Sequence, residues 1–153
     1  MPRRTRRWRL SAPSVTYATV DTSWVIAAEK DPAAARRHIA ALTRIGQVLV
    51  VTPPVTVEAQ QRSRSPGRLP VVLARLARDP VLPEDGDRAA ELLREAGRQS
   101  SEPSARIREI GTNDALIAAI AERLGGIVYT DDATHLNWLR QAGARITVAT
   151  VPF

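Results

Sequence analysis

The segment Val15-Thr16-Tyr17-Ala18-Thr19-Val20-Asp21 is a short run of strand-forming residues that ends at an acid. Two later runs repeat this design, namely Gln47-Val48-Leu49-Val50-Val51 and Ile127-Val128-Tyr129-Thr130, and the second is followed by Asp131-Asp132. Nearly continuous apolar runs of this length are typical of strands that are buried on both faces of a parallel sheet. These three runs therefore predict the centre of the fold.

Helix signals separate the runs. Asp31-Pro32 joins a capping acid to a proline at the first helical position, which predicts a helix to about Ile45 that Gly46 ends. Thr52-Pro53-Pro54 predicts a short helix with Thr52 as its cap. Further helices are expected over 69–78, 84–96, 113–124 and 133–142, a last strand over 145–151, and polar connections over 60–70 and 99–104. Strands that alternate with helices predict an α/β fold with a parallel sheet covered on both faces.

Composition narrows the class of protein. The chain has 153 residues, enough for one domain with a sizeable core, and 44% of them are hydrophobic. It contains no cysteine, which excludes disulfides and thiolate metal sites. The two histidines, His38 and His135, show no metal-ligand spacing, so any metal is expected to be held by oxygen.

The chain is basic, with a formal net charge of +6, and Lys30 is its only lysine. Strongly basic chains commonly bind nucleic acid, and arginine forks suit phosphate. The alternative is that a GC-rich genome raises arginine and alanine together, in which case the charge carries no functional information.

The first ten residues place arginines around Trp8 and superficially resemble a twin-arginine export signal. Ser11-Ala12-Pro13-Ser14 follows where an apolar region would be needed, and no stretch approaches the roughly 20 apolar residues of a membrane span. We therefore expect a cytoplasmic protein without a membrane segment, with a disordered basic extension over 1–14 and one domain over 15–153. The other interpretation of the extension is an RNA-binding arm, with arginines on phosphates and Trp8 on a base.

Four acids follow strands or begin helices. They are Asp21, Glu58, Asp114 and Asp132. Ligands of parallel α/β sheets bind outside the carboxyl ends of the strands, so these acids are expected to share one pocket. Gathered carboxylates repel one another unless a divalent cation neutralises them, and Mg²⁺ and Mn²⁺ prefer oxygen ligands. The competing interpretation makes Glu58 and Asp114 ordinary first-turn acids that complement a helix dipole.

Four segments resemble PIN-domain ribonucleases, specifically the VapC-type toxin of a VapBC toxin–antitoxin pair. They are Val20-Asp21-Thr22-Ser23-Trp24-Val25-Ile26-Ala27, Val55-Thr56-Val57-Glu58, Asn113-Asp114-Ala115-Leu116-Ile117-Ala118-Ala119 and Tyr129-Thr130-Asp131-Asp132. The resemblance covers roughly residues 15–151. It implies a three-layer α/β/α sandwich around a parallel sheet of four or five strands, and hydrolysis of RNA phosphodiester bonds with Mg²⁺ or Mn²⁺.

By this resemblance the catalytic and metal-binding residues are Asp21, Glu58, Asp114 and Asp132. Side chains alternate along a strand, so Thr130 and Asp132 share one side, and the family pattern Thr-x-Asp selects Asp132. Asp131 is then expected to face outward or to cap the next helix.

Other polar residues have two interpretations each. Thr22 and Thr130 either orient metal-bound water or serve in turns and helix caps. Asn113 either caps its helix, which is the favoured interpretation, or contacts the site as a supporting residue. Arg62 and Arg64 either flank the RNA groove or lie in a solvated loop.

Apolar and aromatic positions complete the expectations. Trp24 is expected in the core, and His135 is interpreted as a surface or satisfied histidine rather than a general base. By resemblance, apolar positions in 71–76 and 89–93 line a groove for the antitoxin or a dimer interface, although core packing explains them equally well.

The leading hypothesis is a metal-dependent endoribonuclease toxin. A VapB-like antitoxin would silence it by wrapping the groove and blocking the acids, and a homodimer is expected because family members often dimerise. The alternatives are a PIN nuclease of RNA processing or of DNA without an antitoxin, and a non-catalytic PIN-like RNA-binding module. A nucleotide-binding α/β domain is weaker, since no G-x-G-x-x-G or Walker loop follows any strand.

Overall fold

The structure is a computed structural model that describes residues 14–151 and 153. The basic segment for which an RNA-binding arm or a disordered extension was considered therefore lies almost entirely outside the described residues. Within them, five strands form one parallel sheet in the order β3-β2-β1-β4-β5. The strands are β1 (Thr16–Val20), β2 (Gln47–Val51), β3 (Ala77–Arg78), β4 (Ile127–Thr130) and β5 (Thr147–Thr150). The predicted α/β fold with a parallel sheet is confirmed.

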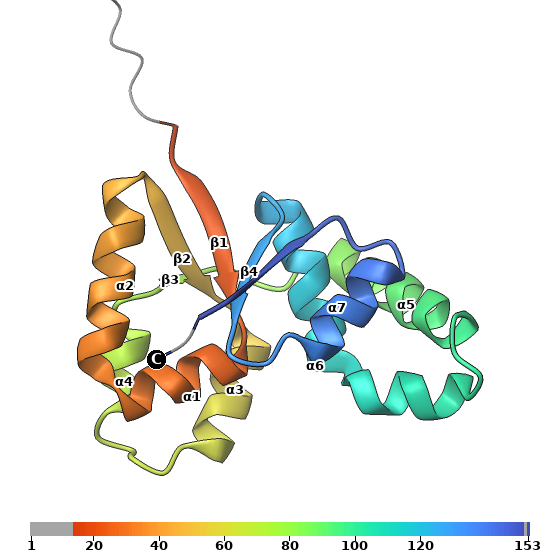
Figure 1. Cartoon of the computed structure of the whole chain (residues 1–153), viewed down its shortest axis with the longest axis horizontal. Coiled ribbons are helices and arrows are strands. Elements are labelled where there is room, and N and C mark those ends of the chain that lie inside the picture. The colour runs from red at the N-terminus through yellow and green to blue at the C-terminus, as the bar shows by residue number, and fades with distance from the viewer. Residues whose placement is uncertain (1–13, 152) are drawn as a thin grey trace, which may run out of the picture.

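Helices cover both faces of the sheet (Figure 1). They are α1 (Thr22–Lys30), α2 (Pro32–Arg44), α3 (Pro53–Arg62), α4 (Leu69–Leu73), α5 (Pro83–Arg98), α6 (Pro103–Leu124) and α7 (Thr134–Gln141). Helices α1, α2 and α4 lie on one side of the sheet, and α5, α6 and α7 lie on the other (Figure 1). Helix α3 contacts both α1 and α6. No helix in the described part of the chain is long and apolar enough to cross a membrane.

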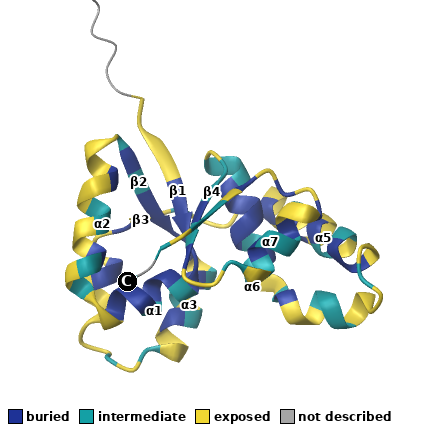
Figure 2. Ribbon diagram, in the orientation of Figure 1, coloured by how far each residue is buried: buried dark blue, intermediate teal, exposed yellow. Residues whose placement is uncertain are grey.

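The core lies between the sheet and these two helical layers (Figure 2). In β1 the exposed residues come first, and Ala18, Thr19 and Val20 are fully buried. Val50 and Val51 at the end of β2 are buried as well. Buried strands have no solvent face, which explains why these runs lack polar alternation. The carboxyl ends of the strands are consequently the rigid part of the sheet.

Helix α1 is an element that the helix signals did not predict. Its buried residues include Trp24, Val25, Ala27, Ala28 and Glu29, so both sides of the helix are covered. A helix that is buried nearly all round shows no amphipathic pattern. The expectation that Trp24 lies in the core is confirmed, since its side chain is fully buried.

Three other boundaries differ from the prediction. The helix expected over 69–78 is the five-residue α4, and Ala77–Arg78 forms the edge strand β3. Helix α6 begins at Pro103 rather than at residue 113, and Gly111 interrupts it with φ 78° and ψ 164°. Thr52 occupies the N-cap position of α3, but its side chain makes no capping hydrogen bond.

Candidate active site

A cavity of about 640 Å³ lies at the carboxyl ends of β1 and β4, between α1, α3, α6 and α7. All four acids predicted for the site line it, and Asp131 lines it too. The lining also includes Thr22, Ser23, Arg62, Glu109, Asn113 and His135. Residues from distant parts of the chain therefore meet at the edge of the sheet where the sequence placed them.

Asp21 is the most deeply buried acid of the cavity, with 5% of its surface exposed. It is the N-cap of α1, where Oδ1 accepts the Trp24 backbone N–H at 2.9 Å and the Ser23 hydroxyl at 2.8 Å. The Thr130 hydroxyl donates to Oδ2 at 2.5 Å. Burial and, to a smaller extent, the charge of Asp114 raise the pKa of Asp21 to about 6 in spite of these bonds.

Asp114 reaches the cavity because Gly111 breaks α6. The break places Asp114 at the start of the second segment, beside His135, whose Nδ1 lies 2.8 Å from Asp114 Oδ2. Burial raises the pKa of Asp114, and the charges of Glu58 and Asp132 add to the increase, while His135 opposes it. The acids therefore act on one another electrostatically, as the shared pocket predicted.

Glu58 is held by neighbours from three elements. Its Oε2 accepts the Thr22 hydroxyl at 2.9 Å and the Asn113 amide at 3.2 Å, and Arg62 donates to Oε1 at 3.2 Å. Burial raises the pKa of Glu58, but these bonds outweigh it, and the net shift is downward. Of the two interpretations of Asn113, the structure supports the site contact, because its amide binds Glu58.

Asp132 and Asp131 both line the cavity and both are exposed. Asp132 Oδ1 accepts the Thr134 backbone N–H at 3.1 Å, which lowers the pKa of Asp132. Asp131 was expected to face outward or to cap the next helix; it is exposed, and the cap-like contact at the start of α7 is made by Asp132. The choice of Asp132 as the ligand stays a prediction.

Sequence reasoning missed Ser23 as a site residue. Its hydroxyl donates to Asp21 and accepts the backbone N–H groups of Asp131, at 2.8 Å, and Asp132, at 3.2 Å. It therefore ties the start of α1 to the turn between β4 and α7. Its position two residues after Asp21 in a turn-forming stretch was the only signal.

His135 is a satisfied histidine, as expected, but its partner is an acid of the site. Its ring stacks on Trp138 with centroids 5.4 Å apart, and the Arg106 guanidinium lies 3.8 Å from the centre of the Trp138 ring. This stack connects the first segment of α6 to Asp114 in the second. The signal in the sequence was its spacing of three residues after Asp132, about one helical turn.

The donor set suits a hard divalent cation in chemistry, since it consists of carboxylates. As the side chains stand, however, residues 14–151 and 153 contain no group of three acids or histidines close enough to hold an ion. Hydroxyl, amide, imidazole and backbone donors occupy the carboxylates instead. A cation would exchange places with some of these donors, and Asp21 and Asp114 would gain most because their pKa values are raised.

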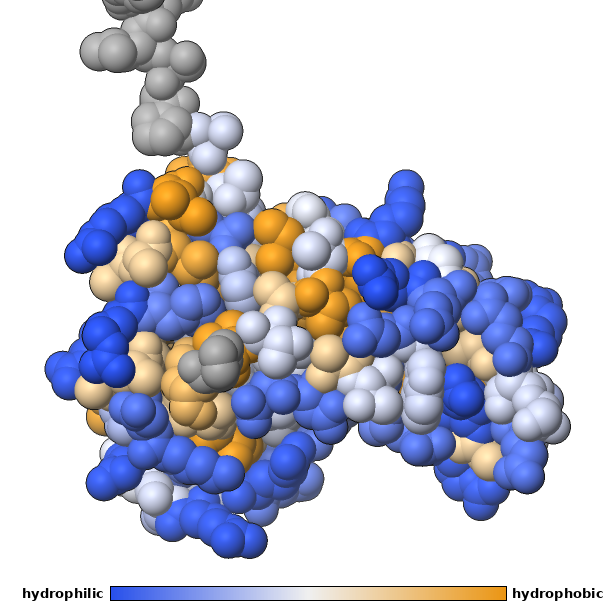
Figure 3. Space-filling view, viewed as in Figure 1, coloured by the Kyte–Doolittle hydropathy of each residue, from blue (hydrophilic) through white to orange (hydrophobic). Residues whose placement is uncertain are grey.

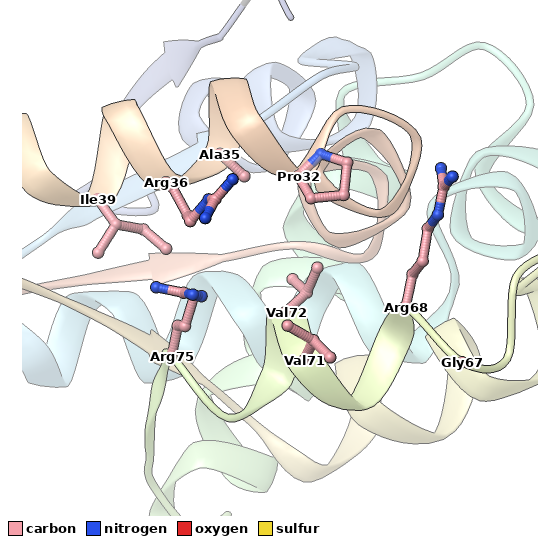
Figure 4. A pocket seen from close by; sticks show the side chains of 9 residues that line it. All are labelled: Pro32, Ala35, Arg36, Ile39, Gly67, Arg68, Val71, Val72 and Arg75. Atoms are coloured by element: carbon pink, nitrogen blue, oxygen red, sulfur yellow. The ribbon is translucent and has the colours of Figure 1, made fainter.

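A separate groove of about 290 Å³ lies between α2 and α4 (Figure 4). Its floor contains Ala35, Ile39, Val71 and Val72, and its rim contains Arg36, Arg68 and Arg75. In the segment 71–76, Val71 is 54% exposed, whereas Val72, Leu73 and Leu76 are buried in the core. In the segment 89–93, Ala89 and Leu92 are buried in the core, so there the core-packing interpretation holds.

Comparisons with known proteins agree with this geometry. A family model described as PIN domain matches residues 18–137. VapBC2 from Rickettsia felis, solved bound to a DNA fragment from their promoter, superposes with a TM-score of 0.69 at 17% identity, over 88% of this chain and 98% of that chain. DNA-bound VapBC from Salmonella typhimurium gives a TM-score of 0.65 at 17% identity, over 90% and 98%. Among curated proteins none matches significantly.

Proposed function

The chain belongs to the PIN domain family, and from this premise we propose that it is a metal-dependent endoribonuclease, the toxin of a VapBC-type pair. The observation that carries the proposal is the cavity at the strand ends, where the four acids within the matched residues face one another. Burial, with a smaller contribution from the charges of neighbouring acids, raises the pKa values of Asp21 and Asp114. A pure RNA-binding module gains nothing from such acids, because they repel phosphate.

Asp21, Glu58, Asp114 and Asp132 would hold Mg²⁺ or Mn²⁺, directly or through water. When bound, such a cation neutralises charge on the scissile phosphate and makes a coordinated water more acidic. Thr22 and Asn113 fix Glu58 from two sides, and His135 fixes Asp114. The protein's contribution to positioning is thus to hold the oxygen atoms of Glu58 and Asp114 within one cavity.

Asp132 differs from the other three acids because it is exposed, and its pKa, like that of Glu58, is lowered. It therefore stays ionised at neutral pH at the mouth of the cavity. Thr130 lies between this residue and Asp21, with its hydroxyl 2.8 Å from the Asp132 carbonyl oxygen. Thr22 and Thr130 contribute by holding carboxylates, in addition to any role toward water.

The groove between α2 and α4 supports a VapB-like antitoxin as partner. An apolar floor bordered by arginines suits an amphipathic segment that carries acids next to its apolar face (Figure 4). On the face drawn in Figure 3, by contrast, hydrophilic residues dominate over α5 and the first part of α6. A small gene directly beside this one would favour the toxin over a processing nuclease without an antitoxin.

The decisive experiment measures Mn²⁺-dependent cleavage of total RNA by the wild type and by Asp114→Asn. We expect at least about a 100-fold loss of activity, comparable to the removal of one preorganised electrostatic contact in other enzymes. Asp31→Asn is the matched control, because Asp31 caps α2 away from the cavity and asparagine caps equally well. Equal cleavage by wild type and Asp114→Asn would refute the assignment.

The expected homodimer and the cytoplasmic location stay predictions. Sedimentation of the purified chain alone and with its partner would give the oligomeric state. Interfaces of obligate dimers bury large apolar areas, so a dimer should persist on dilution to low micromolar concentration or below.

A further inference from the structure

A second cavity, of about 470 Å³, adjoins the carboxylate cavity and shares Arg62 with it. It lies between the end of α1 and the loop that follows α3. Its lining residues are Ile26, Glu29, Lys30, Arg62, Arg64 and Ser65. Three of these six carry a positive charge, so this cavity has the opposite character to its neighbour.

A buried acid fixes the position of Arg64. Glu29 has 3% of its surface exposed, and its Oε1 accepts the Ser63 hydroxyl and the Ser65 backbone N–H, the latter at 3.0 Å. The two serines are the chain neighbours of Arg64, so the backbone is anchored on both sides of it. The side chain of Arg64 itself is exposed. A cation held this way needs little ordering when a ligand binds.

The positively charged residues of this cavity differ in whether they are paired with an acid. Arg62 is paired with Glu58 at 3.2 Å. Within 14–151 and 153, neither Lys30 nor Arg64 forms a salt bridge with an acid. Unpaired cations in a concave surface attract anions more strongly than cations on a flat one.

Building on the proposed function, we propose that Lys30 and Arg64 bind a backbone phosphate of the RNA strand that enters the carboxylate cavity. Arg62 stands between the two cavities and marks the path of the strand. Arginine offers a planar fork to the phosphate oxygens, and lysine offers a point charge. Contacts of this kind position a strand without reading its sequence. They hold the RNA in place against the repulsion of the neighbouring acids.

The test measures binding of a fluorescent single-stranded oligouridine by anisotropy, in chelator to prevent cleavage, over a series of KCl concentrations. For the double variant Lys30→Ala/Arg64→Ala we expect the slope of log K against log salt to fall in magnitude by about 0.7, the value for one phosphate contact on a single strand. The control is Arg44→Ala/Arg94→Ala, which removes two exposed charges of α2 and α5 that line neither cavity. An unchanged slope in the first double variant, or an equal fall in both, would overturn the proposal.

A second variant tests the anchor without removing charge. Ser63→Ala deletes one hydrogen bond to Glu29, and we expect about twofold to tenfold weaker RNA binding with the salt slope unchanged, because Arg64 must then be ordered on binding. Unchanged affinity would show that the anchor plays no part. Failure of the phosphate site is distinguishable from failure of the proposed function: in the first case the wild type still cleaves RNA with Mn²⁺, and in the second it does not.

Discussion

Two groups of acids in this protein differ in whether an arginine pairs with the buried carboxylate. Asp21 of the cavity is 5% exposed, and Asp85, on α5, is 2% exposed. Arg123 donates from Nε to Asp85 Oδ1 at 2.9 Å and from Nη2 to Asp79 Oδ2 at 2.6 Å. Nearby, Arg88 donates to Glu122 at 2.9 Å. The acids of this second group, which we call the paired acids, are Asp79, Asp85 and Glu122.

Within residues 14–151 and 153, Arg62 is the one arginine that pairs with a cavity acid, and its partner is Glu58. The other donors to the cavity acids are hydroxyl, amide, imidazole and backbone groups. The pKa values follow this difference. Burial raises the pKa of Glu122, but the bonds from Arg88 outweigh it and the net shift is downward, whereas the pKa of Asp21 rises to about 6. The paired acids thus keep a permanent cation partner, whereas the cavity acids are held mainly by groups without a permanent charge, which favours the proposed binding of a cation there.

The largest effect on stability should come from removing the cation of the paired acids. Arg123→Gln leaves Asp85 buried without its partner, and we expect a loss of about 3 kcal/mol in the free energy of unfolding. Urea unfolding would measure it. Since Arg123 is remote from the cavity, Mn²⁺-dependent cleavage per folded molecule should stay as in the wild type, and a parallel loss of activity would break the contrast between the two groups.

Asp21→Asn should act in the opposite direction in metal-free protein. A carboxylate whose pKa is raised in the folded state from 3.8 to about 6 contributes stability that is present below pH 3.8 and is lost as the pH rises through about 6. Asparagine removes that cost, so above pH 7 the variant should be more stable by up to about 3 kcal/mol, and the difference should vanish below pH 4. Melting curves in chelator at several pH values measure this. A variant that is less stable at pH 8 would show that the ionised Asp21 carboxylate does not carry this cost.

Mn²⁺ should stabilise the wild type by binding to the cavity acids, as arginine does to the paired acids. At a concentration 100 times the dissociation constant, the gain is about 2.7 kcal/mol. Thermal melting with and without Mn²⁺ measures it, with Asp31→Asn as a control that keeps the gain. If the double variant Asp21→Asn/Asp114→Asn gained as much, the ion would be binding elsewhere.

The smallest effect should come from the arginine of the cavity. Arg62→Gln removes the pair with Glu58, in which the arginine side chain is 53% exposed and the acid 30%. Solvent screening limits such pairs to about 0.2–1 kcal/mol, well below the value for Arg123. Urea unfolding of the two glutamine variants side by side makes the comparison direct. Equal losses in the free energy of unfolding would show that Arg62 and Arg123 contribute equally to stability, contrary to this prediction.

The parts of the fold that sequence predicts are those in which local pattern and tertiary burial agree. The runs at 47–51 and 127–130 match β2 and β4 residue for residue, and Asp31-Pro32 begins α2 as expected. Helix α1 was not predicted because it is buried on both sides and so shows no amphipathic pattern. Strand β3 was not predicted because two residues are too few to show a periodicity. Only the second half of the long helix α6 was predicted. A glycine such as Gly111 indicates a helix end in the sequence, whereas in the structure it forms a kink within α6.

The site was predictable as a set of acids but not in its supporting contacts. Strand ends in a parallel sheet meet at one edge whatever lies between them, so topology alone brings Asp21 near Asp132. Which donor reaches which carboxylate depends on side-chain directions that only the packed structure fixes. For Asn113, local reasoning favoured a cap over the contact with Glu58, and for His135 it gave a satisfied histidine without naming Asp114 as the partner.

The kink at Gly111 has a genetic consequence. A backbone with φ 78° and ψ 164° is essentially open to glycine alone, although a methyl group there would meet no neighbouring atom. Any other residue would therefore strain the turn rather than the packing, and Asn113 and Asp114 would swing away from their partners. If the chain poisons its host, survivors of forced expression should include replacements at Gly111 that leave all four acids intact. Sequencing such escape mutants would reveal which backbone positions the toxicity needs.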